Sequence, residues 1–158
     1  MTRPRRAGPG RRPAREEARS PAGRSVGVGT RELRRQPVAA PQARTLVAEA
    51  LGETGSAPDD DAWSLVVTEL VANAVEHGRG RRIWIRVEAD RERLLVEVEN
   101  RCWTTLPRRR LNVPDRPSGR GLALVAALSR RWGVVREKRG RTRVWAEIPI
   151  RPEGGAPA

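Results

Sequence analysis

Three polar residues, Glu69, Asn73 and His77, recur at intervals of four in a segment that is otherwise rich in apolar residues. In a helix, each interval of four turns a position by about 40° and advances it by about 6 Å, so the three side chains would form one polar ridge. A buried carboxylate and amide are costly without partners. Either Glu69 and Asn73 form an ordinary hydrogen-bonded pair, or a polar ligand occupies a cleft beside them. The spacing leaves both readings open.

The segment that carries this ridge predicts a largely buried helix. The run Asp59–Asp61 supplies carboxylates that cap free amides and suit the positive end of a helix dipole. Gly78 follows His77 and is a natural residue to end the helix. Apolar side chains cover much of the circumference in between: Leu65, Val66, Leu70, Val71, Ala74 and Val75.

The other periodic segments predict two layers of secondary structure. An amphipathic helix comes first, and alternating apolar residues later indicate two pairs of strands with short connections. Arg101–Ser118 contains three prolines and no usable periodicity, so we expect a long loop there. This order predicts an α+β layer sandwich with an antiparallel or mixed sheet. The predicted elements are helices at 41–52, 61–77 and 119–131 and strands around 83–87, 94–98, 133–138 and 142–150.

Composition limits the classes of protein. The 158 residues contain no apolar run near the roughly 20 residues that a membrane-spanning helix needs. The basic N-terminal region is followed by no apolar stretch, so we expect neither a signal peptide nor a membrane segment, and a cytoplasmic location. Cys102 is the single cysteine, so we expect no internal disulfide and no thiolate metal cluster.

The positive charge is concentrated at the N-terminus. The net charge is +13, and residues 1–35 account for +8 of it, with 11 arginines and 3 glutamates. Such a segment buries too little to offset its conformational entropy, so we expect a disordered tail at 1–35. We expect one domain at 36–151 and a second tail at 152–158. Nucleic-acid contact through the N-terminal tail is a lesser alternative, because the charge is not placed on a recognition helix.

Two motifs resemble a known superfamily. The stretch from Glu69 through Asn73 and His77 to Gly78 resembles the N-box of the gyrase, chaperone and histidine-kinase ATPases, and looks most like anti-sigma-factor serine/threonine kinases. Ser118-Gly119-Arg120-Gly121-Leu122 resembles the glycine-rich box that follows the ATP lid in this superfamily. The likeness covers about 36–150. It implies the two-layer α/β sandwich known as the Bergerat fold, with a mixed, mainly antiparallel sheet and helices on one face.

The resemblance also implies roles for single residues. Asn73 would ligate Mg²⁺ through its amide oxygen, because Mg²⁺ prefers oxygen ligands and takes few from protein. Glu69 would be the general base that accepts the proton of a partner's serine. His77 would lie near the nucleotide or lid, although a single histidine is often structural. Gly119, Arg120, Gly121 and Leu122 would open a helix beside the phosphates, or else form a simple loop-to-helix turn.

One motif of the family is altered in this sequence. The family has Asp-x-Gly-x-Gly after the second strand of the hairpin, where the Asp accepts a hydrogen bond from adenine. Here Asn100 occupies the Asp position, and Arg101-Cys102-Trp103-Thr104-Thr105 follows with no glycine. Asn is a neutral and weaker acceptor. Trp103 would either cover the adenine or partly close the pocket.

The resemblance therefore implies an ATP- and Mg²⁺-dependent protein serine/threonine kinase. It would phosphorylate an antagonist protein and sequester a sigma factor, and it could form a homodimer. The altered adenine motif leaves a second reading, a pseudo-kinase that binds proteins without phosphotransfer.

Overall fold

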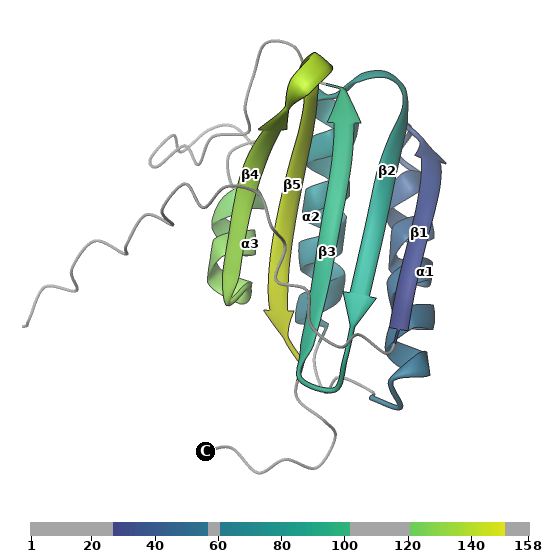
Figure 1. Cartoon of the computed structure of the whole chain (residues 1–158), viewed down its shortest axis with the longest axis vertical. Helices are drawn as coiled ribbons and strands as arrows, with labels where there is room; N and C mark the ends of the chain where they lie inside the picture. The colour runs from purple at the N-terminus through teal and green to yellow at the C-terminus, as the bar shows by residue number, and fades with distance from the viewer. Residues whose placement is uncertain (1–26, 57–60, 102–120, 151–158) are drawn as a thin grey trace, which may run out of the picture.

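A computed structural model describes residues 27–56, 61–101 and 121–150. Over these residues, five strands form one sheet, and three α-helices pack against a single face of it (Figure 1). The elements are β1 (Gly27–Arg34), α1 (Ala39–Glu53), α2 (Ala62–His77), β2 (Arg79–Ala89), β3 (Arg93–Arg101), α3 (Gly121–Leu128), β4 (Arg131–Glu137), the short 3₁₀ helix η2 (Lys138–Gly140) and β5 (Arg141–Pro149).

The sheet has the strand order β1-β2-β3-β5-β4, and every neighbouring pair is antiparallel. The predicted two-layer α+β sandwich, with helices on one face, is therefore confirmed. The turn between β2 and β3 is held by Asp90, whose Oδ1 atom accepts hydrogen bonds from the amides of Glu92 and Arg93 at 2.8 and 2.9 Å.

The alternating apolar residues of the strands lie on the inner face of the sheet, which the helices cover. Ile85 lies opposite Val98, and Val87 lies opposite Val96, so the predicted hairpin pairs its apolar faces in register. The strands β2, β3 and β5 present this face to α1 and α2, and the core lies between the two layers. The amphipathic stripe predicted for the first helix is also buried: Ala43, Leu46, Val47, Ala50 and Leu51.

The predicted helix around Glu69 is present, but it is less buried than its composition suggested. Val66, Leu70, Val71 and Ala74 are in the core, as expected. Leu65, in contrast, is 49% exposed. Helix α2 meets the sheet and its two neighbouring helices with only part of its circumference, so an apolar residue on the remaining side stays in contact with solvent.

The N-terminal boundary of the fold differs from the expectation of a tail through residue 35. Gly27–Arg34 form the edge strand β1, which pairs over its whole length with residues 82–89 of β2. The strand lacks an apolar alternation because small residues face α1. A Cβ atom on Gly27 would fall within 3.0 Å of the carbonyl oxygen of Ala50, and Leu33 is the strand's one large buried side chain. Close backbone packing thus replaces side-chain burial.

The third helix ends earlier than the predicted residue 131. It spans Gly121–Leu128, and Arg131 already belongs to β4. Gly119 and Arg120 lie outside the described residues. Among the helices described, none combines the length and apolar character that crossing a membrane requires.

Candidate functional site

Helix α2 packs against α3 and β3, and Glu69, the first residue of the polar ridge, faces α3. Glu69, Asn73 and His77 are each partly exposed, whereas Leu70 and Ala74, next to them on the helix, are buried. The ridge therefore lies at the margin of the core. Side chains there remain accessible to a polar ligand, and the core fixes the backbone that carries them.

Glu69 lies against the first residue of α3. Its Oε2 atom is within 3.0 Å of the position that a Cβ atom on Gly121 would occupy. Helices α2 and α3 can approach this closely because Gly121 has no side chain. The contact brings together two of the residues that the sequence selected, from motifs 52 positions apart in the chain. It places a carboxylate beside the positive end of a helix dipole.

Asn73 follows one turn further along α2. Its Nδ2 atom is buried and has no hydrogen-bond partner in the described part of the chain. A buried amide donor without a partner costs free energy, of order 1–3 kcal/mol. The ordinary Glu69–Asn73 pair that the spacing left open is not made through this amide. The unsatisfied donor is instead suited to an incoming acceptor.

Asn100, at the end of β3, packs against the last turn of α2. Its side chain is buried, with 7% of the residue exposed, and its Nδ2 atom donates to the carbonyl oxygen of Ala74 at 3.4 Å. A Cβ atom on Gly78 would fall within 3.0 Å of the same Nδ2 atom. Gly78 thus ends the helix and also makes room for Asn100. Asn100, which stands where the family has the adenine-binding Asp, is thus in contact with the helix that carries the ridge.

His77 is half-buried, and its imidazole lies toward Glu76, with Nε2 3.9 Å from Oε2. Leu122 is 5% exposed and packs in the hydrophobic core, so its described contacts are structural. Gly119, Arg120 and Trp103 lie outside the described residues, and their predicted roles remain predictions. The structure therefore brings together Glu69 with Gly121, and Asn100 with Gly78 and the last turn of α2.

Arg35 is a residue of this region that the sequence did not reveal. It follows β1, and its Nη1 atom donates to the carbonyl oxygen of Val75 at 2.6 Å. Its Nε atom donates to the carbonyl oxygen of Gly80 at 2.7 Å. One guanidinium thus ties the C-terminal turn of α2 to the start of β2. In a chain with so many arginines, residue type alone gave no signal.

This geometry can be compared with known families. The family model described as histidine kinase-like ATPase domain matches residues 33–148, which is most of the chain. The chain belongs to this family. No match was found among the curated proteins.

Membership in this ATPase family supports the prediction of an ATP-binding regulatory protein. The match begins at residue 33, within β1, so the ATPase domain includes strand residues that the sequence assigned to a tail. It also spans both Glu69 and Gly121, the two residues whose contact joins α2 to α3.

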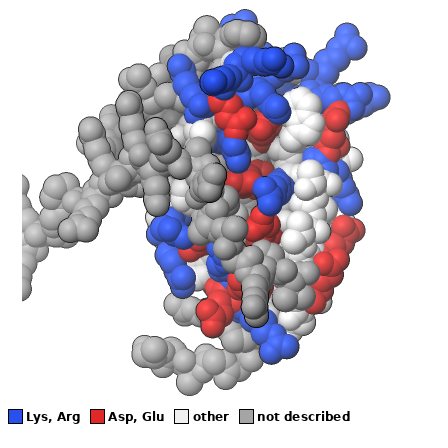
Figure 2. Space-filling view, in the orientation of Figure 1, with Lys and Arg blue, Asp and Glu red and all other residues white. Residues whose placement is uncertain are grey.

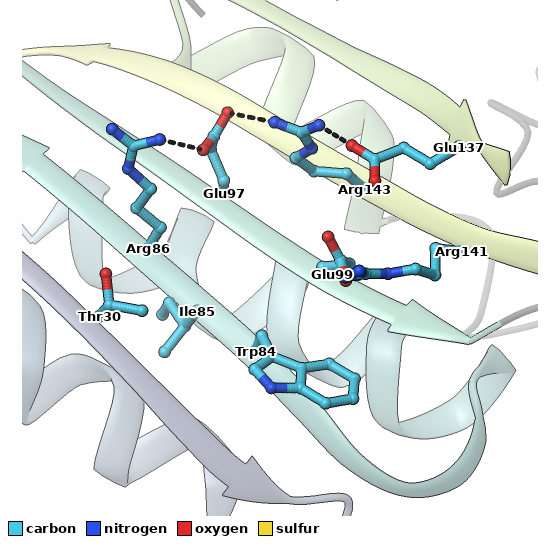
Figure 3. Close-up of a pocket in the computed structure, with 9 residues that line it drawn as sticks. All are labelled: Thr30, Trp84, Ile85, Arg86, Glu97, Glu99, Glu137, Arg141 and Arg143. Atoms are coloured by element: carbon cyan, nitrogen blue, oxygen red, sulfur yellow. Dashed lines mark hydrogen bonds and ion pairs between the residues drawn. The ribbon is translucent and has the colours of Figure 1, made fainter. Parts of the chain in front are cut away.

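The ATPase domain also has a groove on the face of the sheet that the helices leave open (Figure 3). This groove has a volume of about 380 Å³, and none of the sequence-selected site residues lines it. Its charged side chains neutralise one another: Arg143 pairs with both Glu97 and Glu137, and Arg141 pairs with Glu99 (Figure 3). The groove and the ridge on α2 are therefore separate features.

Proposed function

We propose that this ATP-binding domain is a protein serine/threonine kinase of the anti-sigma-factor type. It would transfer the γ-phosphate of ATP to a hydroxyl of an antagonist protein and would also bind a sigma factor. Family membership supports the nucleotide, and the likeness of the Glu69–His77 segment to anti-sigma-factor kinases supports the reaction and the partner classes.

The observation that carries the proposal is the pair of polar groups beside α3. A carboxylate, Glu69, touches the first residue of α3. One turn away, the Nδ2 atom of Asn73 is buried and has no hydrogen-bond partner among the described residues. A purely structural ridge would pair these groups with each other or with the backbone, because unpaired buried donors are rare. A ligand that brings oxygen acceptors would satisfy the Asn73 amide.

The described residues are compatible with Mg²⁺ arriving with the nucleotide. They contain no cluster of three or more His, Cys, Asp or Glu side chains that could hold a metal by themselves. Mg²⁺ commonly takes one or two protein oxygens and completes its shell with phosphate and water. Asn73 would supply its amide oxygen. The ion would neutralise charge on the β- and γ-phosphates.

Glu69 would act on the hydroxyl of the protein substrate. Its carboxylate would accept the hydroxyl proton as the hydroxyl oxygen attacks the γ-phosphorus of ATP. The bond between that phosphorus and the bridging β-phosphate oxygen would break, and ADP would leave. Gly121 allows the carboxylate to stand where it does, and the buried neighbours Leu70 and Val66 hold the helix backbone beneath it. Arg35 and Asn100 donate hydrogen bonds to carbonyl oxygens in the last turn of α2. The helix backbone that carries the ridge is therefore held at both ends.

Binding and transfer can be tested separately. Calorimetric titration with a non-hydrolysable ATP analogue and Mg²⁺ should give binding by the wild type and at least tenfold weaker binding by Asn73→Ala. The exposed residue Ala72 lies on the same helix, and Ala72→Gln serves as the matched control with unchanged binding. Transfer of labelled phosphate to a candidate antagonist should be abolished by Glu69→Gln while analogue binding persists. Equal transfer by wild type and Glu69→Gln would refute the catalytic role.

A second candidate is a binding module without phosphotransfer. Asn100 favours it, because the amide at the adenine position is buried and already bonded to Ala74. This candidate requires a partner complex that is insensitive to Mg²⁺ and to Asn73→Ala. A wild-type protein that shows no heat of binding with the ATP analogue would favour the module over the kinase.

A further inference from the structure

One end of the sheet carries a concentration of positive charge. It is the end where β1, β3 and β4 finish and β2 and β5 begin, at the top of Figure 1, and blue side chains gather there in Figure 2. We call it the basic end. It comprises Arg34, Arg35, Arg79, Arg81, Arg82, Arg101, Arg136, Lys138, Arg139 and Arg141.

The basic end accounts for the positive excess of the described residues. Those residues include 18 arginines and lysines and 13 carboxylates. Ten of the basic residues belong to the basic end, and four carboxylates lie at or beside it: Glu32, Glu76, Glu99 and Glu137. The remainder of the described fold is therefore close to neutral. The sequence showed a charged tail, but it did not show that the folded part also concentrates its charge.

The strand register places like charges directly opposite each other. Arg79 is the partner of Arg101 across β2 and β3, and Arg101 is the partner of Arg141 across β3 and β5. Arg34 is likewise opposite Arg82. Like charges directly opposite in a sheet are destabilising. Adjacent strands are about 4.8 Å apart, so the row from Arg79 to Arg141 is about 10 Å long.

Most of these cations have no carboxylate partner in the part of the chain that the structure describes. Within the described ranges, ion pairs reach Arg82 from Glu32 and Arg141 from Glu99. Seven others have no ion pair with any described residue: Arg34, Arg79, Arg81, Arg101, Arg136, Lys138 and Arg139. In the groove of Figure 3, by contrast, arginines and glutamates are paired. Among the described residues, the basic end is thus a surface whose cations outnumber their carboxylate partners.

We infer that the basic end binds an acidic segment of a protein partner. Three carboxylates spaced four residues apart on a helix, about 6 Å per step, extend over about 12 Å, which is comparable with the arginine row. Arg presents a planar fork that matches a carboxylate bidentately. Glu137 lies opposite Arg141 and Glu99 is bonded to it, so a continuous phosphate backbone would meet negative charge at this end of the row. Discrete carboxylates need not meet it.

This inference does not depend on the nucleotide site. Apart from the half-buried Arg35, the basic end consists of exposed side chains at or beside the strand ends. None of its residues is one of the sequence-selected site residues. Arg35 is the only member with a described role in holding α2, so it is left unchanged in the experiment.

The test compares two triple variants of the full chain that lose the same charge. Arg79→Gln/Arg101→Gln/Arg136→Gln removes three cations of the basic end that have no ion pair with a described residue. Arg31→Gln/Arg91→Gln/Arg130→Gln removes three cations elsewhere. Both keep the arginine-rich residues 1–26, so the contribution of that segment is the same. Fluorescence anisotropy measures binding of a labelled peptide of eight glutamates, and separately of a 20-nucleotide single-stranded DNA, at two salt concentrations.

We expect the basic-end variant to bind the glutamate peptide at least tenfold more weakly than the wild type. The control variant should lose less than threefold. Equal losses in the two variants would overturn the inference, because net charge alone would then explain binding. A basic-end variant that loses DNA binding but keeps peptide binding would also overturn it, in favour of nucleic acid. Circular dichroism and thermal melting of both variants verify the fold, and relief of the arginine row should keep the basic-end variant at least as stable as the wild type.

Discussion

The Oε2 atom of Glu69 occupies the space that a Cβ atom on Gly121 would need. An Ala at position 121 would fall within 3.0 Å of this oxygen, so the carboxylate would have to rotate away from the start of α3. The glycine in the second motif is thus explained by the glutamate in the first. The position of the Glu69 carboxylate depends on the missing side chain at Gly121.

Gly121→Ala should therefore impair the function of Glu69 more than the fold. Displacement of a catalytic group by about 1 Å can cost about 100-fold in rate, so we expect phosphotransfer to fall by about that factor. The free energy of unfolding should change by less than about 1 kcal/mol, because a terminal carboxylate can move and Ala favours helix. Labelled-phosphate transfer and chemical denaturation measure the two effects.

Gly52→Ala is the matched control for this substitution. Gly52 is in α1, and a Cβ atom there would meet no atom of the described residues within 4 Å. The variant should gain up to about 1 kcal/mol of stability and should transfer phosphate as the wild type does. If Gly121→Ala also transfers normally, the position of the Glu69 carboxylate does not matter for the reaction.

Arg35 and its neighbour Arg34 should respond differently to the same change. Arg35→Gln loses two hydrogen bonds from a guanidinium to the carbonyl oxygens of Val75 and Gly80, and we expect a loss of about 2 kcal/mol in the free energy of unfolding. Arg34 is exposed and has no ion pair among the described residues, so Arg34→Gln should change it by less than about 0.5 kcal/mol. Urea denaturation gives both values, and equal losses would contradict the role given to Arg35.

Asn100→Asp should separate stability from adenine binding. The carboxylate cannot donate to the carbonyl oxygen of Ala74, and it would be buried beside that oxygen. We expect a loss of about 1–3 kcal/mol in the absence of ligand. A carboxylate is also the stronger acceptor for the adenine amino group, so the preference for ATP over GTP should rise. Thermal shifts with each nucleotide test this, and an unchanged preference would show that Asn100 does not face the base.

Asp90 predicts a pH dependence of stability. Burial raises the pKa of Asp90, but hydrogen bonds from the amides of Glu92 and Arg93 and from the Arg93 side chain outweigh it and lower the pKa below its ordinary value of 3.8. A lowered pKa in the folded state means that stabilisation is present above pH 3.8 and is lost as the pH falls through the lowered value.

Asp90→Asn should accordingly destabilise the fold by about 1 kcal/mol at pH 7. The difference from the wild type should shrink as the pH is lowered below 3.8. Urea denaturation at pH 7, 4 and 2.5 measures it. Glu92→Gln serves as the control, because it removes an exposed carboxylate from the same turn. A difference that is constant with pH would mean that the charge of Asp90 does not stabilise the turn.

The sequence predicted the parts of the fold that side-chain periodicity encodes. The strand residues Ile85 and Val98 alternate with polar neighbours, and the structure pairs them on the inner face as expected. Strand β1 was missed because Gly27 and Gly29 lie so close to α1 that no side chain fits between them. Glycines at these positions leave no apolar alternation in the sequence.

The site shows the same division. Spacing placed Glu69 and Asn73 on one ridge, but it could not show that the Asn73 amide would lack a partner or that Gly121 would lie against Glu69. Those relationships join residues far apart in the chain. Arg35 was invisible for a different reason, because its donors meet backbone carbonyls, and any sequence offers these.

The last turn of α2 is attached to three strands at once. Arg35 joins it to the end of β1 and to Gly80 at the start of β2, and Asn100 joins it to the end of β3. Amide protons in a turn held in this way should exchange with solvent deuterium only when the sheet itself opens, whereas the exposed side of α1 should exchange through local fraying. The C-terminal turn of α2 should thus belong to the most slowly exchanging unit of the molecule, although it lies at a helix end where exchange is ordinarily fast.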